Sequence, residues 1–221
     1  MLKTSELFSD LSATLAGPLL EQCEYPWEAL GQIKSLILEI GPTLDPAEYE
    51  SPSENVWIHR TAKIYPNNYI AGPAIIGPET EVRPGAFIRG SALVGAKCVV
   101  GNSTELKNCI LFDHVQVPHY NYIGDAVLGS YAHMGAGAIC SNIKADKTNV
   151  VVHSPDGDHP TGLRKFGAIL GDHADVGCNS VLCPGAVLLP WCTVYPLSRV
   201  RGVVPAHSIF KAQDNIVLRR E

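Results

Sequence analysis

Apolar residues recur at every sixth position over most of the chain. The series runs unbroken over residues 58–112, returns at Leu128 and Met134, and runs again over residues 170–200. Small or short residues form a second column four positions further on. A period of six fits neither the 3.6 residues of a helical turn nor the two-residue alternation of a half-buried strand. It is the period of a hexapeptide β-helix, in which each unit supplies one strand and one turn, and three units make a coil.

The pattern predicts a mainly β fold with three parts. Residues 51–207 form a single-stranded parallel β-helix, and residues 143–165, which break the register, leave it as a polar loop. Residues 1–50 form a helical segment and linker, because apolar positions in residues 4–40 have the spacing of two amphipathic helices. We expect these helices to cover the open first coil. Residues 208–221 carry no repeat and are expected to form a C-terminal tail, in which Ile209-Phe210 pack back and residues 214–221 form a helix or a frayed end.

Composition and charge limit which binding partners and which cellular compartment the sequence predicts. The net charge is −5 and no basic cluster is longer than two residues, so a nucleic-acid partner is not expected. No apolar stretch approaches the roughly 20 residues that span a bilayer, so no membrane partner is expected either. The seven cysteines include no C-x-x-C pair, which is typical of reduced, mostly buried thiols in a cytoplasmic protein.

The groups that can do chemistry gather where the six-residue register slips, between Phe112 and Leu128. Five segments in and around this stretch follow in a fixed order: Arg83-Pro84-Gly85-Ala86, Gly101-Asn102-Ser103-Thr104-Glu105-Leu106-Lys107, His119-x-x-Tyr122-x-Gly124-Asp125-Ala126, Gly135-Ala136-Gly137 and Ile139-x-x-Asn142. Over roughly residues 55–205, they resemble the acetyltransferase domain of the bifunctional UDP-N-acetylglucosamine pyrophosphorylase/glucosamine-1-phosphate N-acetyltransferase. The whole chain looks like the stand-alone proteins related to UDP-N-acetylglucosamine pyrophosphorylase.

The resemblance implies a left-handed coil, a homotrimer with sites between subunits, and an acceptor that is an amino-sugar phosphate or a sugar nucleotide. His119 matches the catalytic base that takes a proton from the sugar amine. Arg83 and Lys107 match cations that hold the sugar phosphate. Tyr122 and Asn142 match positions that bind the sugar and the phosphate. The implied reaction is acetyl transfer in nucleotide-sugar metabolism of the UDP-N-acetylglucosamine type.

The resemblance also implies acetyl-CoA as the co-substrate and no metal. The residues that match its groove are Gly135, Ala136, Gly137 and Cys178. This assignment agrees with elementary chemistry, because an amine attacks a thioester only as the free base, and a histidine can accept its proton near neutral pH. Backbone N–H groups of glycine-rich turns can stabilise the oxyanion that forms. Asp125 we interpret as a turn residue, since Gly-Asp is typical of turns.

Two departures from the family pattern keep alternatives open. The residues after Asn142 are Ile143-Lys144-Ala145, where the family has Tyr-Asp-Gly, and this change favours a non-catalytic sugar-nucleotide-binding protein or scaffold. No glycine-rich nucleotide loop is present, so nucleotidyltransferase activity is not supported. A zinc enzyme similar to the γ-class carbonic anhydrases is a further alternative. Its spacing is present in His114 and His119, but no histidine lies between His59 and His114 to supply the usual third ligand.

Overall fold

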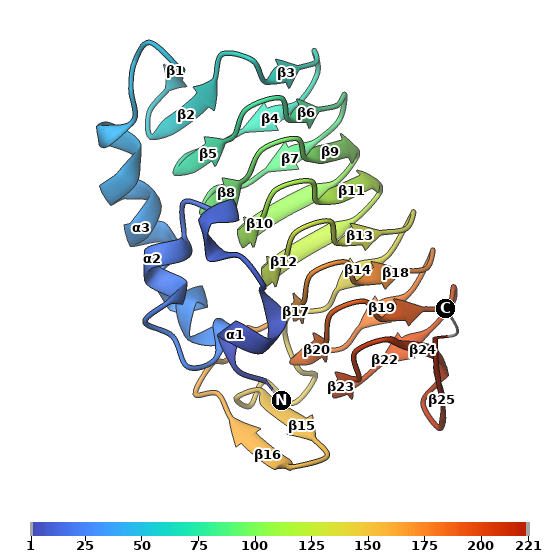
Figure 1. The fold of residues 1–221 in the computed structure, drawn as a ribbon. Coiled ribbons are helices and arrows are strands. Elements are labelled where there is room, and N and C mark those ends of the chain that lie inside the picture. The colour runs from blue at the N-terminus through green and yellow to red at the C-terminus, as the bar shows by residue number, and fades with distance from the viewer. Residues whose placement is uncertain (1, 220–221) are drawn as a thin grey trace.

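The computed structural model, which describes residues 2–219, is a stack of short parallel strands that turn around a common axis (Figure 1). The strands form three walls. The first wall contains β2 (Val56–His59), β5 (Ala74–Ile76), β8 (Ala92–Val94), the second halves of β10 (Glu105–Leu111) and β12 (Tyr122–Leu128), β17 (Ala168–Leu170), β20 (Ala186–Leu188) and β23 (Val203–Val204). The second wall contains β3 (Lys63–Ile64), β6 (Glu81–Val82), β9 (Val99–Asn102), β11 (Gln116–His119), β13 (His133–Met134), β18 (Asp175–Val176), β21 (Thr193–Val194) and β24 (Ser208–Ala212). The third wall contains β4 (Tyr69–Ile70), β7 (Phe87–Ile88), the first halves of β10 and β12, β14 (Ile139–Cys140), β19 (Val181–Leu182) and β22 (Arg199–Val200).

The predicted mainly β, parallel β-helical fold is confirmed. Three corners join the walls, and we name them in chain order: the first corner leads from the first wall to the second, the second corner from the second wall to the third, and the third corner back to the first wall. The inward side chains stack in ladders of aliphatic residues, such as Ile76, Val94, Leu111 and Leu128, each at most 1% exposed. Burial of these ladders is the main driving force for the fold.

The first repeat unit that is shorter than six residues comes earlier in the chain than the sequence pattern indicates. Leu111, not Phe112, lies in the ladder between Val94 and Leu128. The units from Leu106 to Leu111 and from Ile123 to Leu128 therefore contain five residues each. Both cross the third corner, where β10 and β12 continue without a separate turn. Phe112 fits the six-residue series by chance of composition and instead stacks on Phe8 of the N-terminal segment, with ring centroids 4.7 Å apart.

The N-terminal segment differs from its prediction. In place of two amphipathic helices it contains short pieces: α1 (Thr4–Leu7), α2 (Gly17–Leu20), α3 (Ile33–Ile40) and the 3₁₀ turns η1 (Leu11–Ala13), η2 (Pro26–Gly31) and η3 (Gly41–Thr43). These pieces lie along the outside of the stack (Figure 1), where α3 packs on β8 and β10 and η2 packs on β12. The expectation that they cover the first coil is therefore wrong. The strand β1 (Tyr49–Ser53) protects that edge by pairing antiparallel with β2.

Two further segments complete the chain. The loop 143–165 leaves the β-helix at the third corner and contains the hairpin β15 (Val151–Ser154) and β16 (Gly157–Pro160). Ile209 and Phe210 pack back as predicted: they lie in β24, which extends the second wall, and Phe210 is 2% exposed. The predicted helix or frayed end is wrong over residues 214–219, because β25 (Asn215–Leu218) pairs back on β24. The alternating apolar residues Ile209 and Val217 lie opposite each other in that hairpin. Residues 220–221 of the predicted tail lie outside the described residues.

An aromatic ladder follows the first corner. Its rings stack with centroid separations of 4.4, 4.8, 3.8 and 6.4 Å, and its members are His114, Tyr131, His173, Trp191 and His207. All five residues have positive φ, between 51° and 62°. Successive coils therefore make the same left-handed turn at this corner, and the turn repeats closely enough to align the rings.

Candidate functional site

The predicted base lies at the second corner. His119 is the last residue of β11, and its side chain is exposed. Its backbone N–H donates to the side-chain oxygen of Asn121 over 3.1 Å. Asn121, only 2% exposed, also donates to the carbonyl oxygens of Gly135 and Ala138 in the next coil, at 2.8 and 3.1 Å. A buried amide therefore fixes the turn that carries His119 to the turn below it.

The residues predicted to line the acetyl-CoA groove share this corner. The carbonyl oxygen of His119 accepts the Gly137 N–H at 3.0 Å, and that of Ala136 accepts the Asn179 N–H at 2.8 Å. Three turns in successive coils thus carry His119, then Gly135 to Gly137, then Cys178. Glycine is needed at Gly135, because a Cβ there would lie 2.7 Å from the Cys178 nitrogen. The Cys178 thiol is exposed. The structure brings these predicted residues onto one edge of the molecule.

Arg83 lies at the same corner, two coils before His119, because Val82 pairs with Val100 and Val100 with Val117. Its Nε donates to Glu81 Oε2 at 3.1 Å, and about a third of each side chain is exposed. No hydrogen bond joins Arg83 to the other predicted site residues. Arg83 therefore belongs to the corner but not to the group around His119.

The third corner holds a second group, centred on Asp125. Both carboxylate oxygens of Asp125 accept from Lys107 Nζ, at 2.9 and 3.0 Å. One oxygen also accepts from Asn108 Nδ2 at 2.9 Å, and the other accepts from Asn142 Nδ2. Asp125 is 4% exposed and has a φ of 50°. The predicted turn role is therefore only part of its contribution, since its carboxylate also gathers these three donors at the corner.

Tyr122 connects the third wall to this group. Its hydroxyl accepts from Asn142 Nδ2 at 3.1 Å. The ring lies over Gly124, where a Cβ would come within 2.4 Å of the hydroxyl oxygen. Burial, and then the charges of Asp125 and Glu105, raise the pKa of Tyr122, so the phenol keeps its proton and can donate to a ligand. The structure thus brings together Lys107, Tyr122 and Asn142, three of the predicted substrate-binding residues.

The Asp125 group also anchors the segments outside the β-helix. Asn108 Nδ2 donates to the carbonyl oxygen of Leu30 in η2 at 3.0 Å. The carbonyl oxygen of Asn142 accepts the Phe166 N–H at 3.0 Å, and that of Asp125 accepts the Gly167 N–H at 2.8 Å. Both ends of the loop 143–165 therefore meet at Asp125, one through its carboxylate and the other through its backbone carbonyl oxygen.

Sequence reasoning missed Asn108 and Asn121 and underrated Asp125. The signal for Asn108 and Asp125 lies in the two five-residue units, which place both at the third corner in the left-handed region, at φ 50°. That signal was hidden by Phe112, which continues the six-residue series past the first shortened unit.

The two histidines of the zinc alternative lie at different corners. His114 stacks on Tyr131 at the first corner, and His119 lies at the second, at the far end of strand β11. Within residues 2–219, no three His, Cys, Asp or Glu side chains come together as metal ligands do. The geometry therefore gives no support to a zinc site built on this pair. In the same residues, no helix is both long and apolar enough to cross a membrane.

Comparison with known proteins finds sugar-modifying relatives. The model of the GMPPB C-terminal domain family matches residues 70–201. A bifunctional sugar-1-phosphate nucleotidylyltransferase/acetyltransferase of Sulfurisphaera tokodaii is 31% identical over 71% of this chain and 39% of its own length. The bifunctional protein GlmU of a Nostoc species is 30% identical over 84% of this chain and 36% of its own length. The chain therefore spans less than half the length of these curated relatives.

Solved structures with a similar arrangement are more distant. The acetyltransferase domain of PglB from Neisseria gonorrhoeae, in complex with acetyl coenzyme A, has 16% identity and a TM-score of 0.36, covering 73% of this chain and 56% of that one. A mutant of the N-acyltransferase AntD from Bacillus cereus, in complex with dTDP-4-amino-4,6-dideoxyglucose and coenzyme A, has 14% identity and a TM-score of 0.39, covering 79% and 91%.

Proposed function

Because the chain belongs to the GMPPB C-terminal domain family, and its curated relatives include bifunctional acetyltransferases, we propose that it is a CoA-dependent N-acyltransferase. The acetyl group moves from acetyl-CoA to the amine of an amino-sugar phosphate, similar to glucosamine 1-phosphate, or of a sugar nucleotide. The main support is the arrangement at the second corner. There the exposed His119 lies in the coil next to two stacked turns of small residues, which contain Gly135 to Gly137 and Cys178.

The proposed chemistry uses His119 as the general base. The free amine attacks the thioester carbonyl carbon, and His119 takes the proton that the nitrogen loses as the new C–N bond forms. The negative charge on the carbonyl oxygen is stabilised by backbone N–H groups of the neighbouring turns. The C–S bond then breaks, and the CoA thiolate leaves and takes up a proton. Exposure of His119 and Cys178 lets an extended thioester lie along the corner.

The acceptor would bind toward the third wall. Lys107 uses two of its three N–H donors on Asp125, and its side chain is 26% exposed, so one donor remains for a phosphate oxygen. The Tyr122 hydroxyl supplies a neutral donor beside it, and Asn142, whose two Nδ2 hydrogens bond to Tyr122 and Asp125, offers its side-chain oxygen as an acceptor. The second and third corners lie at opposite margins of the third wall, so one subunit alone leaves this face open. A homotrimer, in which a neighbouring subunit closes the face, is part of the proposal.

The test measures thiol release from acetyl-CoA with glucosamine 1-phosphate and a panel of UDP-, GDP- and dTDP-linked amino sugars. The N-acetylated counterparts, which lack the free amine, serve as negative controls. We expect at least one amine to accelerate release, and His119→Ala to lower kcat by about 10²- to 10⁴-fold. The matched control is His114→Ala, which removes another surface histidine at a different corner and should retain the parent rate. Equal rates for His119→Ala and the parent would contradict the assignment of His119 as the general base.

A non-catalytic sugar-nucleotide-binding role is the second candidate. It is favoured by the pairing of both predicted phosphate-binding cations with carboxylates, Arg83 with Glu81 and Lys107 with Asp125. Isothermal titration with the same sugar nucleotides separates the two functions. Binding without thiol release for any amine in the panel supports the second candidate against the first.

A further inference from the structure

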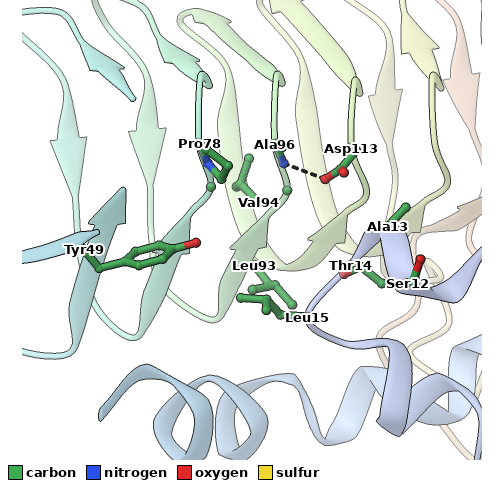
Figure 2. Close-up of a pocket in the computed structure, with 12 residues that line it drawn as sticks. Ser12, Ala13, Thr14, Leu15, Tyr49, Pro78, Leu93, Val94, Ala96 and Asp113 are labelled. Carbon is green, nitrogen blue, oxygen red and sulfur yellow. Dashed lines mark hydrogen bonds between the residues drawn. The ribbon is translucent and has the colours of Figure 1, made fainter. Parts of the chain in front are cut away.

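A pocket of about 190 Å³ lies between the N-terminal segment and the β-helix, away from both groups of site residues (Figure 2). One side is formed by residues 12–15 and by Tyr49 of β1. The other side is formed by the first-corner residues that end or follow β5, β8 and β10: residues 77–78, 93–96 and Asp113. The residues that line the pocket therefore come from three parts of the chain that are far apart in sequence.

The body of this pocket is apolar. Leu15 and Leu93 lie side by side, and the Tyr49 ring extends across from β1 toward them (Figure 2). Pro78 and Val94 line the opposite side. Leu15 is 41% exposed, so part of its side chain is open to the pocket. A small apolar group would cover Leu15 and release the water that now contacts it.

Two polar atoms face the same space. Asp113 Oδ1 accepts the Ala96 N–H at 2.6 Å, an approach that Gly95 permits, since a Cβ there would lie 2.5 Å from this oxygen. No hydrogen bond within residues 2–219 involves Asp113 Oδ2 or the Tyr49 hydroxyl. Burial, and then the negative charges of Glu48 and Asp113, raise the pKa of Tyr49, so its hydroxyl stays protonated. No lysine, arginine or histidine lines the pocket.

We propose that this pocket binds a small primary ammonium compound with an unbranched apolar body. The ammonium group donates to Asp113 Oδ2, and the apolar body extends from there against Leu15 and Leu93. A carboxylate without a neighbouring cation attracts a positive ligand and repels an anion. At about 30 Å³ for each water-sized group, the volume holds roughly six non-hydrogen atoms. The ligand bridges the N-terminal segment and the β-helix, so its binding favours the docked segment.

The first experiment compares three probes of equal length on the full chain: n-pentylammonium, 1-pentanol and pentanoate. Methyl-labelled leucine and valine are followed by NMR during each titration. We expect the signals of Leu15, Leu93 and Val94 to shift with pentylammonium, with a Kd on the order of 1 mM. Pentanol should bind at least fivefold more weakly, and pentanoate should cause no saturable shift. Equal affinity for the amine and the alcohol, or shifts confined to other methyl groups, would overturn the proposal.

The second experiment uses variants. Asp113→Asn retains a side-chain oxygen for the Ala96 N–H and removes the charge, so the preference for the amine over the alcohol should disappear while pentanol still binds. The matched control is Glu79→Gln, which removes a carboxylate that pairs with Lys97 beside the pocket but does not line it. This variant should bind both probes as the parent does. An unchanged preference in Asp113→Asn contradicts the proposal, and the comparison of probes on the parent protein decides the matter if that variant does not fold.

Discussion

Asp125 carries a backbone role and a side-chain role at the same time. A φ of 50° is uncommon for residues other than glycine, and aspartate and asparagine tolerate it better than most. Sequence reasoning finds this first role in the pair Gly124-Asp125. The second role needs three donors from the two neighbouring coils, Lys107 and Asn108 from one and Asn142 from the other, and their meeting depends on how the coils are aligned. A one-residue change in register would separate them.

The residue-scale prediction concerns this carboxylate. Asp125→Ala leaves a half-buried lysine and two amides without their acceptor, and we expect a loss of about 3 kcal/mol in the free energy of unfolding. Asp125→Asn keeps one oxygen and tolerance of the left-handed conformation, so its loss should be smaller. Urea unfolding measures both. The control is Asp156→Ala in the exposed loop, expected within about 0.5 kcal/mol of the parent. An Asp125→Ala value as small as that of the control would show that the group contributes little.

At the scale of elements, the sequence predicts the walls well and the corners poorly. A wall position depends on one apolar side chain, so the period of six identifies it directly. A corner depends on local φ values and on contacts with segments elsewhere in the chain. The site residues at the second corner were grouped through the family resemblance, whereas the shortened units at the third corner, which the period of six does not indicate, were missed. Gly17-Pro18 and Pro26 divide the N-terminal segment into short pieces, although its apolar spacing resembles that of longer helices.

The element-scale prediction concerns the thiols inside the β-helix. Burial raises the pKa of Cys98, Cys140 and Cys192 to about 12 and also raises the pKa of Cys109 and of Cys23, which is buried under the N-terminal segment's own contacts. Because the thiolate is the reactive form, these cysteines stay protonated and unreactive at pH 8. We expect two of the seven thiols, Cys178 and Cys183, to react with an aromatic disulfide reagent in the folded protein, and all seven to react in urea. Cys178→Ser should reduce the folded value to one.

The same shifts set a pH dependence of stability. In the unfolded chain each of these thiols titrates near its ordinary pKa of 9.0, so above that pH the unfolded chain loses protons that the folded chain retains. The unfolded state then binds fewer protons, and the free energy of unfolding falls as the pH rises above about 9. Reaction of more than two thiols at pH 8 without loss of structure would contradict the burial that underlies both expectations.

At the scale of the whole molecule, the N-terminal segment alters what a β-helix usually does. In a solenoid each coil contacts only its neighbours, so stability is a sum of local terms. Here the segment joins distant coils. Leu30 bonds to Asn108, Ala13 accepts the Asp113 N–H, and Ser9 bonds to Asp172. We therefore expect the central coils to open as one unit rather than separately.

The prediction at the scale of the whole molecule tests the hydrogen bonds that hold the N-terminal segment on the β-helix. Asp172, 4% exposed, accepts the backbone N–H and the hydroxyl of Ser9 at 2.8 and 2.7 Å and the Ser130 N–H at 2.9 Å. Asp172→Ala should lower the free energy of unfolding by about 2–4 kcal/mol. It should also speed amide hydrogen exchange in residues 4–13 more than in the coils. The control is Asp175→Ala, whose exposed partner is His133. Equal exchange in residues 4–13 of the parent and Asp172→Ala would mean that other contacts, not those of Asp172, hold the N-terminal segment in place.

The bond from Ser9 to Asp172 also orders events during synthesis. Residues 2–40 leave the ribosome before the coils on which their apolar side chains pack. The partner of Ser9 is 163 positions later in the chain, which at translation speeds of about 5–20 residues per second is a delay of roughly 8 to 30 s. The N-terminal segment therefore docks long after its own synthesis, and during that interval its exposed leucines and isoleucines are available to chaperones.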